Sequence, residues 1–379
     1  MRISILHLIT GRLTVATYFA AVLLPVLLLG YDGPWFGPGD ISIRGKSSFP
    51  RTFSPGFYSA FDLWFADQLG LRYPLIYAGT SFHIGALRRP VDRRVIFGRD
   101  GWLFWTDDRD TAPAAMADTR GKLRFKPGEI KRIDAQLRSI REQLMACDIP
   151  SAVLVAPNKQ SIYGEFLTNM AAGVPSSRFD VLLSALGPVA SEMIIDPRPI
   201  MREAKLAHAP MRLYNKTDTH WNDLGAYYGY VAVMQKVAPM LPGHPEVKPL
   251  DEYQLLAARY RGGDMAARVL FSPWRFDDED VSLSPKGPLS AQRETQIDEV
   301  HFVSRNPSAT GRLVIFGDSF AERMVQFFTP HFNEVHRYLG GTFDGSIIAI
   351  HRPQFVLLEV TERYLDELLK PPVGLACRM

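Results

Sequence analysis

The chain has 379 residues, of which 46% are hydrophobic and 22% are charged, and its formal net charge is +3. This length is sufficient for one large α/β domain or two smaller ones, each with a buried core. The basic residues occur only in small groups, such as Arg88-Arg89, and never in a long run. Because a nucleic-acid-binding protein concentrates positive charge, we expect no nucleic-acid partner.

The N-terminal region contains an uncharged apolar segment. Residues 13–30 read LTVATYFAAVLLPVLLLG, and a helix of that length spans about 27 Å, close to the hydrocarbon thickness of a bilayer. Arg2 and Arg12 precede the segment, and Asp32 is the first charge after it. This asymmetry favours a short cytoplasmic end at residues 1–12. We therefore predict a single-pass signal anchor in the inner membrane, with the rest of the chain in the periplasm.

Alternatives to the anchor are a cleaved signal peptide and a buried core helix. No small-x-small cleavage site precedes Tyr31, and the flanking charges argue against a core helix. A lipoprotein is excluded, since no cysteine follows the apolar run. In an exported domain, Cys147 and Cys377 would form a disulfide or remain free, and the sequence leaves both outcomes open.

Residues 31–90 are predicted to form a Gly/Pro/Ser-rich linker followed by a packing helix. The helix is indicated by apolar side chains at helical spacing from Phe57 to Leu69. The next segment, residues 93–108, reads RRVIFGRDGWLFWTDD and predicts a β-hairpin with its turn at Arg99-Asp100-Gly101. Strand alternation places Trp102 and Phe104 on one face, which we predict to be core and not a surface that stacks on sugars.

The region 91–379 is predicted to be one α/β domain. A charged helical pattern at residues 128–146 precedes a continuous apolar run at 150–156, and similar units recur at 192–201, 311–328 and 353–360. Buried strands that alternate with helices indicate a doubly wound parallel sheet with flanking helices. The polar, proline-containing segment 261–296 is expected to be a long loop or insertion.

Ser319 is the candidate nucleophile. It lies in Gly317-Asp318-Ser319-Phe320, between the apolar run 313–316 and a helix-like segment. A serine at such a junction lies at the carboxyl edge of the sheet, where ligands bind and where backbone N–H groups can stabilise an oxyanion. Gly317 would allow the tight turn and the close approach of substrate. The alternative is a chance GDS triplet in a loop.

Asp218 and His220 are the candidate activating pair. They are two residues apart, so in an extended segment they point to the same side. A carboxylate fixes the tautomer of the imidazole and stabilises the imidazolium that forms when serine loses its proton. Trp221 and Asn222 follow directly and are predicted to contact substrate.

Two other roles compete for this pair: a metal-binding Asp-x-His and a structural pair that caps the next helix. Metal binding would require further ligands at suitable spacing. The nearby His208 and His244 lie in no recognisable motif. We therefore expect neither a metal nor a cofactor in the reaction.

The segments that carry these residues resemble a known family, the alginate O-acetyltransferases of the AlgJ/AlgX type, whose catalytic domains are similar to SGNH hydrolases. The resemblance extends from about Val91 to Arg363, and its most specific elements are DTHWN followed by GDSF. Ordinary SGNH esterases have the opposite order, with GDS near the start. The matching segments are FGRDGWLFW (97–105), VLVAPNKQSIY (153–163), TDTHWNDLGAYYGY (217–230) and VIFGDSF (314–320).

The resemblance implies an SGNH hydrolase-like fold over residues 91–379, with nucleophile Ser319, base His220 and orienting Asp218. It also implies an acetyl-serine intermediate, a membrane-bound O-acyltransferase partner that supplies the acetyl group, and a polysaccharide hydroxyl as acceptor. Asn158, Lys159 and Tyr163 lie in a matching segment without an assigned role, and Glu362 and Arg363 are expected to be structural. An acetylesterase with the same triad and a catalytically silent scaffold of an export complex are the alternatives.

Overall fold

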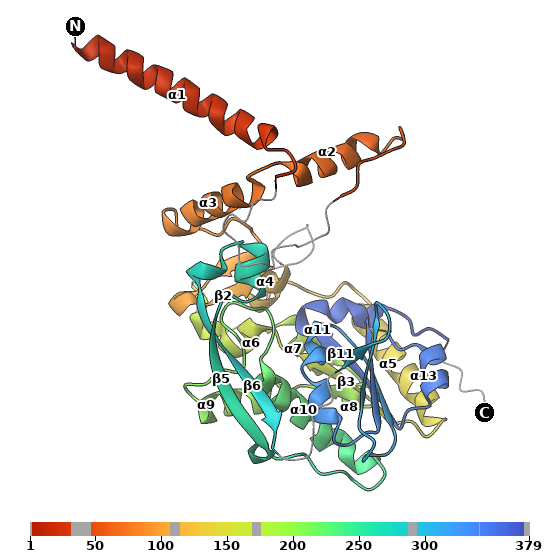
Figure 1. The fold of residues 1–379 in the computed structure, drawn as a ribbon. Coiled ribbons are helices and arrows are strands. Elements are labelled where there is room, and N and C mark those ends of the chain that lie inside the picture. The colour runs from red at the N-terminus through yellow and green to blue at the C-terminus, as the bar shows by residue number, and fades with distance from the viewer. Residues whose placement is uncertain are drawn as a thin grey trace. The chain divides into compact units, whose positions relative to one another are not determined.

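The computed structural model describes residues 2–31, 47–106, 114–168, 176–286, 294–340 and 342–374 (Figure 1). The chain divides into two compact units. The first unit contains residues 1–92 and 266–275, and the second contains residues 93–265 and 276–379. The chain therefore leaves the second unit once, after Met265, and returns to it at Phe276.

The first unit is helical. Its helices are α1 (Arg2–Leu27), α2 (Phe57–Gln68) and α3 (Arg72–Gly85). The predicted helix is confirmed as α2, whereas its packing against a larger body stays a prediction. The end of α1 is fastened to the α2–α3 turn, because the Gly70 amide donates to the Pro25 oxygen (3.0 Å) and the Gly30 amide donates to the Gln68 oxygen (2.7 Å).

The prediction of a transmembrane anchor at residues 13–30 is not confirmed. Among the described residues, no helix combines the length and the apolar character needed to cross a membrane. Residues 13–27 belong to α1, and residues 28–30 form a turn.

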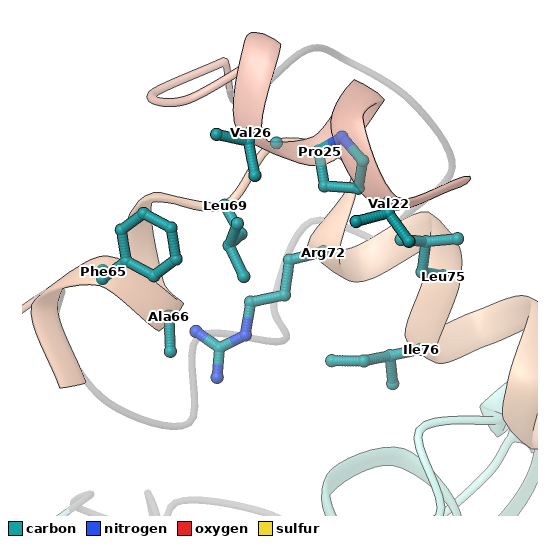
Figure 2. A pocket seen from close by; sticks show the side chains of 10 residues that line it. Val22, Pro25, Val26, Phe65, Ala66, Leu69, Arg72, Leu75 and Ile76 are labelled. Atoms are coloured by element: carbon teal, nitrogen blue, oxygen red, sulfur yellow. The ribbon is translucent and has the colours of Figure 1, made fainter. Parts of the chain in front are cut away.

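A pocket of about 520 Å³ lies where the three helices of the first unit meet (Figure 2). Apolar side chains such as Val22, Phe65 and Ile76 line it. Its charged lining residue, Arg72, forms an ion pair with Asp67 at 2.6 Å. With no nucleophile or acid–base pair among its lining residues, this pocket is not the candidate active site.

The second unit is built on a mixed sheet, which has seven strands among the described residues, in the order β4-β3-β11-β9-β10-β8-β7. These strands are β3 (Ser151–Ala156), β4 (Ile194–Ile195), β7 (Thr295–Gln296), β8 (His301–Arg305), β9 (Arg312–Gly317), β10 (Glu334–Leu339) and β11 (Phe355–Thr361). The helices of this unit are α4 (Ala114–Thr119), α5 (Glu129–Met145), α6 (Lys159–Tyr163), α7 (Arg178–Ala185), α8 (Pro188–Met193), α9 (Arg198–Ala207), α10 (Asp223–Val237), α11 (Ser319–Glu322), α12 (Val325–Phe328) and α13 (Gly345–His351).

The prediction of an α/β sheet is confirmed, but the prediction that all of its strands are parallel is wrong. Strands β4, β3, β11, β9 and β10 run parallel, whereas β8 is antiparallel to β10 and β7 is antiparallel to β8. A parallel connection requires a crossover of about a dozen residues or more. Only residues 306–311 connect β8 to β9, so β8 enters the sheet in the opposite direction.

Helices cover both faces of the sheet, and alternate strand residues belong to two separate cores. In β3, Leu154 and Ala156 belong to one core, whereas Val153 and Val155 belong to the other. Helix α10 packs in the first core, and the buried face of α5 packs in the second. Figure 1 shows α5 and α13 on one side of the sheet and α10 on the other. The central strands β3, β9 and β11 are buried on both faces, which explains their continuous apolar sequences.

The predicted hairpin is confirmed. Strands β1 (Val95–Phe97) and β2 (Leu103–Trp105) are antiparallel. Asp100 and Gly101 in the turn have φ of 55° and 79°, which is the left-handed region that an Asp-Gly pair tolerates. Trp102 and Phe104 are buried and their rings stack, as predicted for core residues.

The expectation of a long loop at residues 261–296 is wrong for much of that segment. Strands β5 (Tyr253–Arg261) and β6 (Asp277–Pro285) form a long antiparallel ribbon (Figure 1). Polar residues alternate with apolar ones in β6, and Val281 and Leu283 are buried. The ribbon has one buried and one exposed face, so its sequence resembles that of a loop.

The question whether Cys147 and Cys377 form a disulfide falls partly outside the described residues. Cys147, which follows α5, is disulfide-bonded. Cys377 is not among the described residues. The pairing of Cys147 with Cys377 therefore lies outside the described residues.

Candidate active site

The carboxyl ends of three neighbouring strands meet at one edge of the sheet. These strands are β3, β11 and β9, and they are followed by Asn158, Glu362 and Ser319 respectively. In open α/β sheets, ligands bind at this edge. The edge is therefore where a reactive side chain of this fold is expected.

The turn that carries Ser319 is fixed by hydrogen bonds. The Asp318 amide donates to Glu359 Oε2 (3.0 Å), and the Phe320 amide donates to Asp318 Oδ1 (2.8 Å). A Cβ on Gly317 would lie 2.8 Å from the Ala321 Cβ, so the turn requires glycine at this position. Ser319 itself is exposed at the start of α11, where its hydroxyl is accessible.

The structure brings Ser319, His220 and Asp218 into one hydrogen-bonded chain. Ser319 Oγ lies 2.7 Å from His220 Nε2, and His220 Nδ1 lies 2.7 Å from Asp218 Oδ1. The same Asp218 oxygen accepts a 3.0 Å bond from the His220 amide. One imidazole nitrogen therefore faces the hydroxyl while the other is held by the carboxylate, which is the geometry of an activated serine.

A second carboxylate, Asp264, supports this pair. Its amide donates to Asp218 Oδ2 (3.0 Å), and its Oδ2 lies 3.6 Å from His220 Nδ1. Thr219 Oγ1 donates to the same Asp264 oxygen at 2.6 Å. Sequence reasoning missed Asp264 because it lies in the segment predicted to be a loop. The sequence carries no local signal for this contact, which the structure shows as a close approach of Gly263, where a Cβ would lie 2.6 Å from the Asp218 Cβ.

Lys159 holds the chain that leads to Asp218. Its Nζ donates to the main-chain oxygens of Asn215 (3.0 Å), Lys216 (2.8 Å) and Asp218 (2.6 Å). Burial lowers the pKa of Lys159 to about 7, but three carbonyl acceptors match the three N–H donors of the ammonium form. Lys159 therefore donates all of its hydrogen bonds to residues 215–218, the segment that leads to His220.

Asp278 of β6 is the second support of the same turn. Its buried carboxylate accepts from the amides of Lys216 (3.1 Å) and Thr217 (2.7 Å). It also forms an ion pair with Arg212 at 3.1 Å. Residues 215–218 are thus held by α6 through Lys159 and by the ribbon through Asp278.

The charges of the site shift three pKa values. Burial opposes ionisation of Asp218, but the hydrogen bond and the charge of His220 outweigh it and hold the pKa of Asp218 below its usual range. Burial lowers the pKa of His220, but the hydrogen bond and charge of Asp218 and the charge of Asp264 raise it above its usual value. Burial and the charge of Asp218 raise the pKa of Asp264. Asp218 is therefore the permanently charged partner of His220.

A family model described as "SGNH hydrolase-like domain, acetyltransferase AlgX" matches residues 95–324, which is more than half of the chain. The chain belongs to this family. The match includes the hairpin, the Asp218–His220 turn and Ser319. It confirms the SGNH hydrolase-like fold and the resemblance to the AlgJ/AlgX type, and at family level it supports an acetyltransferase-like enzyme.

Two curated AlgX-family relatives are each named "Probable alginate O-acetylase AlgJ". The protein from Pseudomonas putida is 25% identical over 230 residues, which cover 58% of this chain and 54% of the relative. The protein from Pseudomonas aeruginosa is 26% identical over 147 residues, covering 39% and 32%. The chain thus spans about half the length of the Pseudomonas putida relative and about a third of the Pseudomonas aeruginosa relative. The solved structure of Bacillus cereus PatB1 matches with a TM-score of 0.52 and 15% identity, covering 73% of this chain and 98% of PatB1, which shows a common fold.

Two predicted substrate contacts of this AlgX-family site lie in the interior. Trp221 is 0% exposed, and its Nε1 donates to the Phe320 oxygen (3.0 Å). Asn222 is also 0% exposed, and its Oδ1 accepts from the Gly225 amide (3.1 Å) to cap α10. Both residues are large enough to reach substrate but are already fully packed. Trp221 thus joins the residue after His220 to the residue after Ser319, whereas Asn222 holds the start of α10.

The other residues from the matching segments lie at the same edge. Glu362 is buried and accepts from the Asn158 amide (3.0 Å). Tyr163 accepts from the Leu213 amide (2.9 Å). Arg363 donates to Asn158 Oδ1 (3.3 Å), and its guanidinium lies 5.2 Å from the centre of the Phe320 ring. These contacts join the ends of β3, β9 and β11, consistent with structural roles.

Asp218, His220 and Asp264 are also close enough together to bind a metal ion. However, His220 Nδ1 bonds to Asp218 and Nε2 faces Ser319. A metal ion would have to displace one of these two partners. The arrangement as it stands is that of a proton relay to a serine.

Proposed function

We propose that the second unit is an O-acetyltransferase that moves acetyl groups to polysaccharide hydroxyls through Ser319. The observation that carries the proposal is the pair of 2.7 Å contacts that link Ser319 Oγ to His220 and His220 to Asp218. Membership of the AlgX family supports acetyl transfer as the reaction. The relatives named as probable alginate O-acetylases support a polysaccharide as acceptor.

In the first half-reaction, His220 Nε2 takes the proton of the Ser319 hydroxyl as Oγ attacks the carbonyl carbon of the acetyl donor. The negative charge on the carbonyl oxygen faces backbone N–H groups at the start of α11, among them the Ser319 amide. The donor oxygen then leaves with the proton from His220. Acetyl-Ser319 and the deacetylated donor are the products.

In the second half-reaction, a sugar hydroxyl replaces the donor. It gives its proton to His220 Nε2 and attacks the acetyl carbonyl carbon. The Ser319 oxygen leaves, takes the proton back from His220, and the acetylated sugar is released. Asp218 remains ionised throughout and stabilises the imidazolium in both halves.

An acetylesterase is the second candidate, and the exposure of Ser319 favours it. Water has access to an acetyl group on this oxygen, so hydrolysis competes with transfer unless the acceptor excludes it. The two activities share every step up to acetyl-Ser319. They differ only in whether water or a sugar hydroxyl is the second nucleophile.

The test uses the full chain, an aryl acetate as donor, and an oligosaccharide as acceptor. A transferase gives an acetylated oligosaccharide, detected by mass spectrometry, at the expense of free acetate. Acetate release that no sugar changes indicates the esterase. A serine-reactive sulfonyl fluoride should label Ser319, and the absence of both labelling and turnover in folded protein would leave only a silent scaffold.

The donor and the compartment are further parts of the proposal. We infer that a membrane-bound O-acyltransferase supplies the acetyl group, as the family resemblance implies. A location outside the cytoplasm, in the periplasm, is supported by the disulfide-bonded Cys147, because disulfides persist in oxidising compartments. Detection of the chain in a periplasmic or a cytoplasmic fraction tests this part separately.

A further inference from the structure

Three histidines meet on one face of the sheet in the second unit, away from Ser319. His301 begins β8, His336 lies in β10, and His351 ends α13. His336 is buried, and the other two are half-buried. Each ring offers a nitrogen such that the three nitrogens lie within 4.8 Å of one another. Strands β8 and β10 and helix α13 thus place three imidazole nitrogens, which are good metal ligands, close together.

The spacing of these nitrogens suits a small tetrahedral ion. His301 Nε2 lies 3.1 Å from His336 Nδ1, and the rings of His336 and His351 have centroids 3.9 Å apart. Zinc–nitrogen bonds of about 2.0–2.1 Å in tetrahedral geometry set ligand nitrogens about 3.3–3.4 Å apart. Three histidines with an open fourth position are an established zinc arrangement. Small ring movements would therefore complete the site.

Polar groups around the cluster orient its rings. Glu334 Oε2 lies 3.4 Å from His336 Nε2, so this ring can donate to the carboxylate and turn Nδ1 towards His301. The Tyr338 hydroxyl lies 2.7 Å from His351 Nε2, which leaves His351 Nδ1 as the free ligand atom when Nε2 donates. A carboxylate behind a ligand histidine is the usual outer partner in metal sites.

The charges that face the cluster are balanced. Glu334 also pairs with Arg312 (2.8 Å) and Arg305 (3.4 Å), and Asp298 accepts from the His301 amide (2.8 Å). Burial lowers the pKa of all three rings, that of His336 to about 4. Neutral imidazole is the form that binds a metal ion.

We propose that His301, His336 and His351 bind a zinc ion, with Glu334 orienting the His336 ring. The ion would join the antiparallel strand β8 and helix α13 to the parallel part of the sheet. His336 is in register with Val314 near the start of β9, whereas Ser319 follows the end of that strand. The zinc site is therefore separate from the residues of the proposed acetyl transfer.

The sharpest test is calorimetric titration of the chelator-treated full chain with zinc chloride. We expect one zinc per chain and an increase in Tm that depends on zinc concentration. Cobalt should give the visible absorption of a tetrahedral site. The double variant H301Q/H351Q changes only half-buried rings, and it should lose both zinc binding and the zinc-dependent increase in Tm.

Two further variants distinguish zinc binding at the three histidines from zinc binding elsewhere in the chain. Glu334→Gln should weaken zinc binding by about 10- to 100-fold, as expected for an outer partner. His220→Ala should leave it unchanged, because His220 belongs to the other cluster. The proposal is overturned if the wild-type chain binds no zinc, or if H301Q/H351Q retains binding that His220→Ala removes. The first outcome has no bearing on whether Ser319 is acetylated, whereas the second would place zinc at His220 and would also count against the proposed relay.

Discussion

The side chain of Lys159 donates a 2.6 Å hydrogen bond to the main-chain oxygen of Asp218. Lys159 begins α6 at the carboxyl end of β3, and Asp218 is the carboxylate that holds His220. The Lys159 Nζ also lies 5.6 Å and 5.5 Å from the ring centres of Trp102 and Phe104 in the predicted hairpin. A single buried lysine thus connects the hairpin, the sheet and the segment that carries Asp218 and His220.

Replacing Lys159 with methionine should weaken both folding and turnover. The variant removes one hydrogen bond from each of three main-chain oxygens, of which that of Lys216 keeps its 2.9 Å bond from the Leu103 amide. This loss should cost about 1–3 kcal/mol of unfolding free energy. Because the Asp218–His220 turn loses a support, kcat should fall more than KM changes. Chemical denaturation and steady-state ester kinetics measure the two effects. A destabilised variant with an unchanged kcat would show that Lys159 acts on folding alone.

Replacing Ser319 with alanine should remove turnover without affecting folding. Loss of the nucleophile should reduce kcat by about 10⁴-fold or more. The side chain is exposed, so the free energy of unfolding should change by less than about 0.5 kcal/mol. Ser184→Ala, at an exposed serine of α7, is the matched control and should retain full activity.

The losses from changing Ser319 and His220 should not add. His220→Ala removes the base without which the serine is not activated, so the double variant should be no slower than either single variant. Rates of aryl acetate hydrolysis for the three proteins test this. A double variant slower than both single variants by the product of their effects would mean that the two residues act independently.

Replacing Asp264 with asparagine should shift the pH dependence of activity. The charge of Asp264 helps to raise the pKa of His220, and only neutral His220 accepts the Ser319 proton. Removing that charge lowers the pKa of His220, so the acidic limb of the kcat/KM profile should move to lower pH. The exposed Asp251→Asn is the control and should leave the profile in place. A shift to higher pH would contradict the assignment.

The raised pKa of His220 also has a consequence for stability. Its contribution is fully present below the unfolded-state pKa of about 6.5 and is lost as pH rises through the higher folded-state value. The difference in unfolding free energy between wild type and His220→Ala should therefore shrink above neutral pH. Urea denaturation at several pH values measures it.

Replacing Gly263 with alanine should disturb the site more than the fold. The new Cβ would lie 2.6 Å from the Asp218 Cβ and 2.7 Å from its amide nitrogen. Asp218 would have to shift, and a displacement of about 1 Å can cost about 100-fold in rate. At Gly164, where no atom lies within 4 Å of a Cβ and φ is −59°, alanine should leave activity unchanged. Ester kinetics and thermal unfolding of both variants test the contrast.

The residues of the proton relay were predictable from sequence because each lies in a local pattern. Asp218 and His220 are two positions apart, and Ser319 lies between an apolar strand and a helix. Asp264 was not predictable in this way, since its position depends on a ribbon that folds back on the turn. The three histidines were missed for the same reason, because they come from elements that only the folded sheet brings together.

The errors in the predicted fold have equally local causes. The direction of β8 depends on how short the connection after it is, and apolar runs do not reveal direction. Trp221 was assigned to the substrate because it follows His220, but alternation turns its side chain inward, where Phe320 accepts its hydrogen bond. The position of Trp221 next to His220 in the sequence therefore predicted correctly that it lies near the site. It predicted wrongly that the Trp221 side chain is exposed.

The excursion of the chain between Met265 and Phe276 has a practical consequence for truncation. Within the first unit, Trp274 packs on Tyr77 (ring centroids 4.4 Å apart), and Ser272 bonds to Thr80 at 2.9 Å. A protein shortened to begin at Arg93 would keep Trp274 and Ser272 but lose both partners. Residues 266–275 lie in the sequence between Asp264 and Asp278, which both support the segment that carries Asp218 and His220. Without their contacts in the first unit, residues 266–275 would hold Asp264 and Asp278 less firmly. Crystallographers and enzymologists should keep residues 47–92 attached, or replace residues 266–275 by a short polar link.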